Sequence, residues 1–321
     1  MRCLTVTLNT AVDTTYTLES FHRGQVNRVS RSIAVPGGKG NNVAKVLSAL
    51  GHSVIATGII AGRSGQFIEQ GLRSTGIETS FLVVPGESRV CLTLLEKDSG
   101  TVSELLEPGI EVSLEDARRF LHHVSELVDS ADAVVVSGSL PAGLPTDYYA
   151  RLLSELRSRT KYLAFDSSGE ALRLGLAGRP NLVKPNEAEM RALAGGQPTS
   201  DEMIAFARGH LIGRVLGPGA QVLLSLGARG AYLIGERGVW IARPLAIDVV
   251  NPVGAGDALL AGCLSARSRD AEDRDALRRA VAVGAVAAMQ EVPGAVDMVT
   301  AMRLEASVEV EPLRVRAKSA T

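Results

Sequence analysis

The sequence predicts an α/β fold, in which helices cover both faces of a mostly parallel sheet and a small separate sheet is added. Short apolar runs alternate along the chain with longer stretches of 3.6-residue periodicity. Strands and helices that alternate in this way favour parallel strands joined by helical crossovers. The expected architecture is therefore a three-layer αβα sandwich.

The apolar runs define the strands that we expect in the main sheet. They are residues 4–8, 53–57, 133–137, 162–166, 182–184 and 222–225. The expected helices are residues 42–50, 65–74, 114–128, 146–158 and 187–193. Small or polar residues follow several strands, as in Ser137-Gly138-Ser139. Because ligands of open α/β sheets bind outside the carboxyl ends of the strands, we expect the functional site at that edge.

A second sequence pattern interrupts the first at about residues 10–36 and 86–107. Residues 13–18, 25–35, 89–96 and 102–106 alternate polar and apolar side chains, which is typical of antiparallel strands with one solvated face. We expect these segments to form a small lid sheet over the crevice, within a single domain that spans residues 1–321. The charged and small residues from Pro312 onward are expected to fray.

Composition limits the classes of function that the chain can serve. Its 321 residues are 45% hydrophobic and carry a formal net charge of −1, with no basic excess for nucleic acid or a membrane surface. The three cysteines are far apart, which argues against a disulfide framework or a zinc site. The N-terminus reads as a strand rather than a signal peptide, and no apolar stretch is long enough to cross a bilayer. We expect a cytoplasmic enzyme without nucleic-acid or membrane partners.

Asp257 is the first residue for which the sequence indicates a chemical role. It ends the run Asn251-Pro252-Val253-Gly254-Ala255-Gly256-Asp257, directly before an apolar, helix-like stretch. A helix N-terminus among small residues presents unpaired N–H groups, which suit the charge on a transferring phosphoryl group. An aspartate there can accept a proton from a substrate hydroxyl. Aspartate is also a common N-cap, so this motif alone leaves a capping role equally open.

A second glycine-rich motif, Pro36-Gly37-Gly38-Lys39-Gly40-Asn41-Asn42, also precedes a helix-like stretch. Lys39 offers a cation for a phosphate, and Asn42 offers an amide for sugar hydroxyls. The spacing is neither that of a Walker A loop nor that of a Rossmann fingerprint. A glycine-rich turn into a helix is the plain alternative.

Two further motifs follow expected strands. In Lys184-Pro185-Asn186-Glu187-Ala188-Glu189, the side chain of Glu189 can orient a hydrated Mg²⁺, although an ordinary acidic helix start explains the pattern equally well. The segment Ser225-Leu226-Gly227-Ala228-Arg229-Gly230 is typical of a turn that faces a nucleotide, but alone it is only a glycine turn.

Taken in this order, the four motifs resemble the PfkB (ribokinase-like) family of carbohydrate kinases, whose two signatures match residues 37–44 and 251–258. The resemblance extends from about residue 4 to about residue 297. It implies a ribokinase-like sandwich with a β-sheet lid, and ATP and Mg²⁺ as cofactors. Relatives in the wider family also bind a monovalent cation near the second signature. Here the carbonyl ligands for that cation would lie around Asp248, Val250 and Gly294.

Within the family the chain resembles the hexose-phosphate kinase branch, which holds 1-phosphofructokinase, PfkB-type 6-phosphofructokinase and tagatose-6-phosphate kinase. Residues 7–13 are similar to the T-L-N-P-x-x-D start of that branch, with Thr10 in place of the usual Pro. The resemblance implies that Asp13 binds sugar hydroxyls and that Arg89 grips the sugar phosphate beside Lys39. Residues 89–92, 139–149 and 249–253 are more similar to the tagatose kinase, but they do not decide the substrate.

The resemblance also assigns a role to each motif residue, listed here by role. The catalytic group is Asp257 as base with Gly254, Ala255 and Gly256; the substrate group is Asp13, Gly38, Lys39, Asn42, Arg89 and Ser139; the ATP group is Lys184, Asn186, Ser225, Gly227, Gly230 and Gly254; and Glu189 serves the metal.

The expected reaction is ATP-dependent phosphorylation of a ketohexose phosphate: tagatose 6-phosphate, fructose 1-phosphate or fructose 6-phosphate. One alternative is a kinase of an unphosphorylated sugar or nucleoside, against which Lys39 and Arg89 argue. The other is a non-catalytic sugar-phosphate sensor, against which Asp257 argues. The exposed face of the lid strands also predicts a homodimer formed through the lid.

Overall fold

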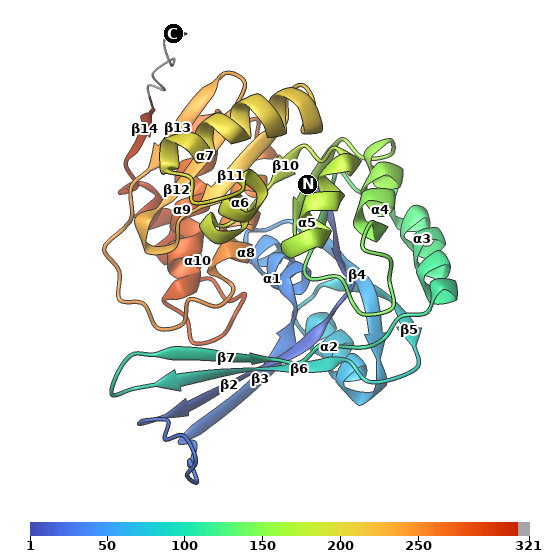
Figure 1. Ribbon diagram of the computed structural model, residues 1–321. Helices are drawn as coiled ribbons and strands as arrows, with labels where there is room; N and C mark the ends of the chain where they lie inside the picture. Colours follow the sequence, from blue (N-terminus) through green and yellow to red (C-terminus); the bar gives the residue numbers. More distant parts are fainter. Residues whose placement is uncertain (314–321) are drawn as a thin grey trace.

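The computed structural model describes residues 1–313, and within them ten strands form one large sheet (Figure 1). In spatial order the strands are β14 (Val310–Pro312), β13 (Gly238–Ala242), β12 (Ala231–Gly235), β11 (Gln221–Ser225), β10 (Leu182–Val183), β9 (Tyr162–Asp166), β8 (Ala133–Ser137), β1 (Arg2–Thr7), β4 (Ser53–Ala61) and β5 (Glu78–Val84). The pairs from β11 to β5 are parallel, and β12, β13 and β14 add an antiparallel edge. The expected mostly parallel sheet is confirmed.

Helices cover both faces of this sheet. One face packs against α3 (Leu114–Val128), α4 (Tyr148–Arg157), α5 (Gly169–Gly175), η1 (Leu176–Gly178), α6 (Glu187–Ala194), α7 (Ser200–Phe206) and its continuation η2 (Ala207–Leu216). The other packs against α1 (Lys39–Ala49), α2 (Gly62–Ser74), α8 (Ala255–Arg267), α9 (Asp273–Ala288) and α10 (Met298–Glu305).

Strand β8 shows why the sequence gives two cores. Successive side chains of a strand point to opposite faces. Val134 and Val136 enter the core under α3 and α4, whereas Val135 enters the core under α1 and α8. A strand buried on both faces must be apolar throughout, which is the pattern of a parallel sheet. The three-layer sandwich follows from such strands.

A smaller sheet with the order β3-β2-β6-β7 forms the lid at the bottom of Figure 1. Its strands are β2 (Ala11–Leu18), β3 (Arg31–Gly37), β6 (Arg89–Glu96) and β7 (Val102–Leu106). Arg31 of β3 pairs with Glu291, which lies after α9, at 2.6 Å. The lid therefore contacts the main body beside the second signature.

Two details of the lid correct the sequence-based expectation. The β2–β3 and β6–β7 pairs are antiparallel as expected, but β2 and β6 pair in parallel and join the two hairpins into one sheet. The strand expected over residues 25–35 begins only at Arg31. Before it, the amide side chain of Asn27 donates to the carbonyl of His22 at 2.9 Å and ties residues 22–27 into a local loop.

Two further expectations concern the termini and membranes. Pro312 ends β14, and most of the terminal segment that was expected to fray lies outside the described residues. No helix within residues 1–313 combines the length and the apolarity needed to cross a membrane. The cysteines all lie in this part of the chain, and each is buried and free of a disulfide.

Candidate active site

The residues singled out in the sequence gather at the carboxyl edge of the main sheet. Asp166 is the last residue of β9, Lys184 follows β10 directly, and Ser225 ends β11. Helices α1 and α8 lie side by side on one face, and both begin at this edge after a glycine. The candidate residues thus meet at the edge where the sequence predicts a site, outside the carboxyl ends of parallel strands.

Asp257 is the third residue of α8 and does not cap it. The N-cap is Gly254, which has a φ of 82° in the left-handed region that glycine adopts without strain. The backbone N–H groups of Gly256 and Asp257 have no hydrogen-bond acceptor among residues 1–313, whereas the amide of Ala255 donates to the carbonyl of Pro252 at 3.1 Å. The amides of Gly256 and Asp257 are therefore available to a transferring charge, and the amide of Ala255, which was assigned to the catalytic group, is not.

The Asp257 carboxyl group is buried, with only 5% of the residue exposed. The side-chain amide of Asn42 donates to its Oδ2 at 3.0 Å. Burial, and then the nearby charge of Asp166, raise the pKa of Asp257 to about 7, although Lys39, Asn42 and Lys184 oppose the rise. A carboxylate with a pKa close to neutral is a more effective general base than one with an ordinary pKa.

Asp166 is the centre of the charged cluster beside Asp257. It is fully buried, with its Oδ1 3.4 Å from Nζ of Lys39 and its Oδ2 3.2 Å from Nζ of Lys184. Burial opposes the charge of Lys39, but Asp166, Asp257 and Glu189 outweigh it and hold the pKa of Lys39 above its usual value. A side chain at Gly256 would lie 3.5 Å from Nζ of Lys184. Two ammonium groups thus stand next to the start of α8.

The substrate group forms a connected set under the lid. The Asp13 carboxylate rests against Gly37, where a Cβ would lie 2.1 Å from its Cγ. Burial raises the pKa of Asp13, while Lys45, the amide of Gly38 and Arg89 lower it. Arg89 donates to the carbonyl oxygens of Glu107 at 3.1 Å and Asn9 at 3.4 Å, and it forms no ion pair within residues 1–313. The side-chain amide of Asn9 in turn donates to Oγ of Ser139 at 3.0 Å.

The motifs assigned to ATP and metal show more local structure. Asn186 and Glu189 form a capping box at the start of α6, because each side chain accepts from the other's backbone N–H at 2.8 Å. The helix-start interpretation is therefore correct for both residues. The capping hydrogen bond uses Oε2 of Glu189, so its Oε1 is free to bind a ligand. Within residues 1–313 no group of three or more His, Cys, Asp or Glu could hold a metal ion.

The glycine turn after β11 divides into two parts. Ser225 forms a bridge with Asn186, which joins this turn to the start of α6. Gly227 begins a short turn, η3 (Gly227–Arg229), and a side chain there would meet open space. A side chain at Gly230 would lie 2.1 Å from the carbonyl oxygen of Ala242. Close packing against β13 accounts for Gly230, so contact with a nucleotide is not needed to explain it.

Sequence reasoning gave no chemical role to two central residues, Asp166 and Lys45. The signal for Asp166 is its position as an acidic residue at the end of a strand, next to the other strand ends that carry the motifs. Lys45 lies one turn after Asn42, and its Nζ donates to the carbonyls of Pro36 at 2.8 Å and Pro293 at 2.6 Å. Burial lowers the pKa of Lys45 to about 8, against the attraction of Asp13 and Asp257. One of these partners, Pro293, is 248 positions away, so a local pattern could not indicate it.

Comparison with known proteins now decides the family. Residues 6–298, almost the whole chain, match the model of the pfkB family carbohydrate kinases. The chain belongs to this family. This PfkB kinase is 36% identical over 296 residues to the tagatose-6-phosphate kinase of Staphylococcus epidermidis, which covers 92% of this chain and 94% of the relative. The enzyme class is therefore that of a phosphotransferase.

Solved structures show the same fold for this PfkB kinase. Phosphofructokinase-2 from Escherichia coli in complex with potassium is 25% identical, covers 95% of this chain and 98% of its own, and superposes with a TM-score of 0.86. A possible 1-phosphofructokinase from Thermotoga maritima is also 25% identical, covers 98% of this chain and 100% of its own, and gives a TM-score of 0.84. Both neighbours belong to the hexose-phosphate kinases that the sequence resembles.

Proposed function

We propose that this protein transfers the γ-phosphoryl group of ATP to a free hydroxyl of a ketohexose phosphate, with Asp257 as the catalytic base. The observation that carries the proposal is the position of Asp257: it is buried, held by Asn42, and next to the unpaired amides of Gly256 and of its own residue. A base adjacent to preorganised N–H donors is what phosphoryl transfer to an alcohol requires.

Each group of the site has one task in this mechanism. The sugar hydroxyl approaches the carboxylate of Asp257 and gives up its proton as its oxygen bonds to the γ-phosphorus. The bond from that phosphorus to the β–γ bridging oxygen of ATP breaks, and ADP is the leaving group. The charge that builds on the phosphoryl oxygens is stabilised by the amides of Gly256 and Asp257, together with Lys184 beside them. Asn42 fixes the orientation of the base. Most of the rate enhancement then comes from positioning and electrostatics.

A phosphate already present on the acceptor explains one cation on the lid, Arg89, and a second at the start of α1, Lys39. Arg89 is held by two carbonyl oxygens and has no carboxylate partner within residues 1–313, so its guanidinium is preorganised for an external anion. Lys39, whose pKa is raised, supplies a second positive charge. Asp13, Gly38 and Ser139 then remain for the sugar hydroxyls. Among the three ketohexose phosphates, we favour tagatose 6-phosphate, because the curated relative reported above carries that substrate in its name.

ATP and Mg²⁺ complete the proposal. Mg²⁺ keeps several waters and needs few protein carboxylates, so the free Oε1 of Glu189 suits it through a bound water. When bound with ATP, Mg²⁺ neutralises charge on the phosphates. In the proposed site Lys184, Asn186, Ser225, Gly227 and Gly254 border the nucleotide.

We also propose that a monovalent cation binds near the second signature, residues 251–258. The amides of Val250 and Asn251 both donate to the carbonyl of Ala288, which brings residues 250–254 beside residues 288–295. A cavity of about 460 Å³ lies there, lined by Val250, Met289, Gln290, Glu291, Val292 and Ala295. Backbone carbonyls are suitable ligands for such an ion, and the neighbour from E. coli binds potassium. Activity in potassium buffer should exceed activity in a buffer free of alkali ions.

A panel of acceptors tests the proposed function. Purified protein is incubated with MgATP and, separately, tagatose 6-phosphate, fructose 1-phosphate, fructose 6-phosphate, ribose and adenosine, and the phosphorylated product is identified. We expect turnover with the phosphorylated ketohexoses and most with tagatose 6-phosphate. Turnover with ribose or adenosine alone would contradict the phosphate clamp. No turnover with any acceptor would favour the sensor instead.

A further inference from the structure

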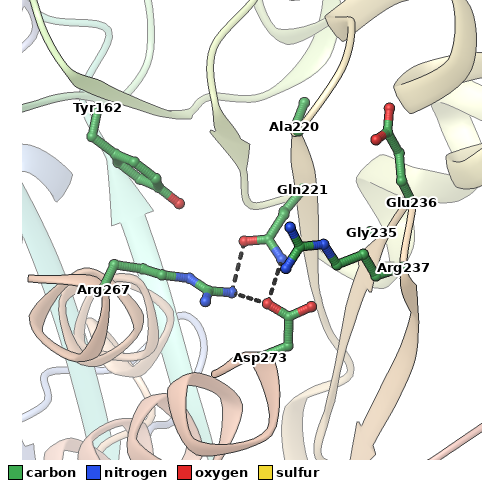
Figure 2. A pocket seen from close by; sticks show the side chains of 9 residues that line it. Tyr162, Ala220, Gln221, Gly235, Glu236, Arg237, Arg267 and Asp273 are labelled. Carbon is green, nitrogen blue, oxygen red and sulfur yellow. Dashed lines mark hydrogen bonds and ion pairs between the residues drawn. The ribbon is translucent and has the colours of Figure 1, made fainter. Parts of the chain in front are cut away.

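A second cavity lies at the edge of the main sheet that is opposite the active site (Figure 2). Its volume is about 310 Å³, within the range of pockets that bind small molecules. Tyr162 is the first residue of β9 and Gln221 is the first residue of β11, so the cavity is at the amino ends of the strands whose carboxyl ends carry Asp166 and Ser225. We call it the rear cavity.

A polar network closes the inner wall of the rear cavity. Arg267 donates to Oε1 of Gln221 at 2.8 Å and to the carbonyl of Ala271 at 2.8 Å, and it pairs with Asp273 at 2.5 Å. The amide of Gln221 also donates to Asp273 at 3.0 Å. The charge of Asp273 is thus satisfied within the wall, as the dashed lines of Figure 2 show.

Donors without a partner remain around the rear cavity. The hydroxyl of Tyr162 and Nε of Arg267 are buried near each other, and in the described part of the chain neither has a partner in ordinary hydrogen-bond geometry. Burial, and then the neighbouring Cys263, raise the pKa of Tyr162 and outweigh the opposing influence of Arg267, so its hydroxyl stays protonated and can donate. Buried polar groups without partners are uncommon in native proteins and call for a ligand or a bound water.

Arg237 supplies the positive charge of the rear cavity. It lies in the two-residue turn between β12 and β13, and its side chain makes no hydrogen bond or ion pair within residues 1–313. In Figure 2 it extends toward the cluster of Gln221 and Asp273, whereas Glu236 points away. An exposed guanidinium at the rim of a cavity that also contains a buried hydroxyl donor is suited to a ligand with an oxyanion.

Three elements connect the rear cavity to the active site. β9 runs from Tyr162 to Asp166, β11 runs from Gln221 to Ser225, and α8 runs from Ala255 to Arg267 with Asp257 in its first turn. Any ligand that shifts the cavity wall acts on the far ends of these three rigid elements. A rigid element carries energetic coupling between two sites when ligand binding at each site favours one position of that element.

We propose that the rear cavity binds a small metabolite that carries an oxyanion, and that its occupancy changes the affinity of the active site for its substrates. Arg237 and the hydroxyl of Tyr162 hold the oxyanion, while the Arg267–Asp273–Gln221 network holds the wall in shape. The oxyanion is a phosphate or a carboxylate, and two probes distinguish them: inorganic phosphate and succinate.

Binding is measured first, because it needs no catalytic turnover and is independent of the proposed function. Each probe is titrated by calorimetry into the intact protein and into Arg237→Ala, Tyr162→Phe and Arg118→Ala variants. Arg118 is an exposed arginine on α3 and serves as the matched control. We expect a site that weakens at least about 10-fold in Arg237→Ala, weakens in Tyr162→Phe, and is unchanged in Arg118→Ala. Equal affinity in Arg237→Ala and Arg118→Ala would contradict the proposal.

The single tryptophan provides a local readout of the same event. Trp240 lies on β13, three residues after Arg237. The probe that binds should change Trp240 fluorescence in the intact protein and not in Arg237→Ala. An identical change in both proteins would mean that the probe acts from the active-site phosphate clamp, which would overturn the rear site.

Communication with the active site is measured by steady-state kinetics. Without probe, Arg237→Ala and the intact protein should have the same kcat and KM. With saturating probe, the KM of the intact protein for ATP or the sugar phosphate should change by about 5-fold or more, which is the usual lower range of allosteric coupling. Arg237→Ala should not respond. A probe that binds at Arg237 and leaves both KM values unchanged would refute the coupling.

Discussion

Asp257 and Asp166 are both buried carboxylates, yet their surroundings give them different tasks. Asp166 lies between two ammonium groups and is compensated by them. Asp257 accepts from Asn42 and faces two N–H groups, and the charge of Asp166 helps to raise its pKa to about 7. Neighbouring acids whose environments differ in this way often divide the roles of a site between them. In the proposed mechanism Asp166 positions cations and Asp257 takes the proton.

The pH dependence of the reaction should reveal this arrangement. A base with a pKa of about 7 is protonated below that pH, so kcat/KM should fall as the pH drops through about 7. Asp166→Asn removes the charge that raises this pKa, so the fall should move to lower pH. Asp147→Asn, on the exposed start of α4, is the control and should not move it. An unchanged profile in Asp166→Asn would contradict the electrostatic account.

At the scale of residues, the sequence predicts site residues that stand in short motifs, but it does not predict contacts between residues that are distant along the chain. Lys39, Asn42 and Asp257 stand in local patterns, and the structure brings all three together. Asp166 also contacts Lys39, 127 positions away, and Lys45 also contacts Pro293, 248 positions away, and only the fold shows these contacts. The helix cap also needed the structure, because a sequence with two glycines before Asp257 does not show that Gly254 is the capping residue.

At the scale of elements, the first turn of α8 is held by close backbone contacts. Gly254 is in the left-handed region, and a Cβ there would lie 3.3 Å from both the amide N of Gly294 and Cβ of Pro293. Lys45 fixes the same loop through the carbonyl of Pro293. Helix α8 therefore begins at a position set by the loop after α9.

Replacing Gly254 tests whether this position matters for catalysis. Gly254→Ala forces a left-handed conformation on alanine and should cost roughly 1–2 kcal/mol of stability in chemical denaturation. Turnover should fall by at least about 10-fold, because the amides of Gly256 and Asp257 move. Gly76→Ala is the control: its φ is 80° but its surroundings are open. It should lose similar stability and keep its turnover, and equal turnover in both variants would refute the positioning role.

The elements themselves were largely predictable where periodicity is strong. Residues 114–128, 133–137 and 162–166 were expected with the bounds that the structure shows. Strands β5, β12 and β14 were not among the expected strands, although β5 and β12 contain the apolar runs Phe81–Val84 and Tyr232–Ile234. The parallel pairing of β2 with β6 was also not predictable, since it joins residues that are 78 positions apart, such as Ala11 and Arg89.

At the scale of the whole molecule, the lid presents apolar side chains to solvent. Val26, Leu105 and Leu106 are 84%, 53% and 61% exposed, and β3 and β7 are the edges of the lid sheet. Exposed apolar residues beside unpaired strand edges mark a surface that another chain can cover. We propose a homodimer that buries this surface, in which the same patch of each lid faces its partner.

A charged residue on the lid should disrupt that dimer. The double variant Leu105→Lys/Leu106→Lys should run as a monomer in sedimentation velocity at concentrations where the intact protein is dimeric. Val299→Lys, at a residue of α10 that is 78% exposed, is the control and should remain a dimer. A lid variant that sediments like the control would exclude the lid as the interface.

The catalytic role of Asp257 is the central claim, and one variant tests it most directly. Asp257→Asn keeps the size and the hydrogen bond from Asn42 but removes the group that accepts the proton. Turnover of the best acceptor should fall by about 100-fold or more, in line with the contribution of general bases, while ATP binding measured by calorimetry stays within a few-fold of the intact protein. Near-normal turnover with intact ATP binding would contradict the assignment of Asp257 as the base.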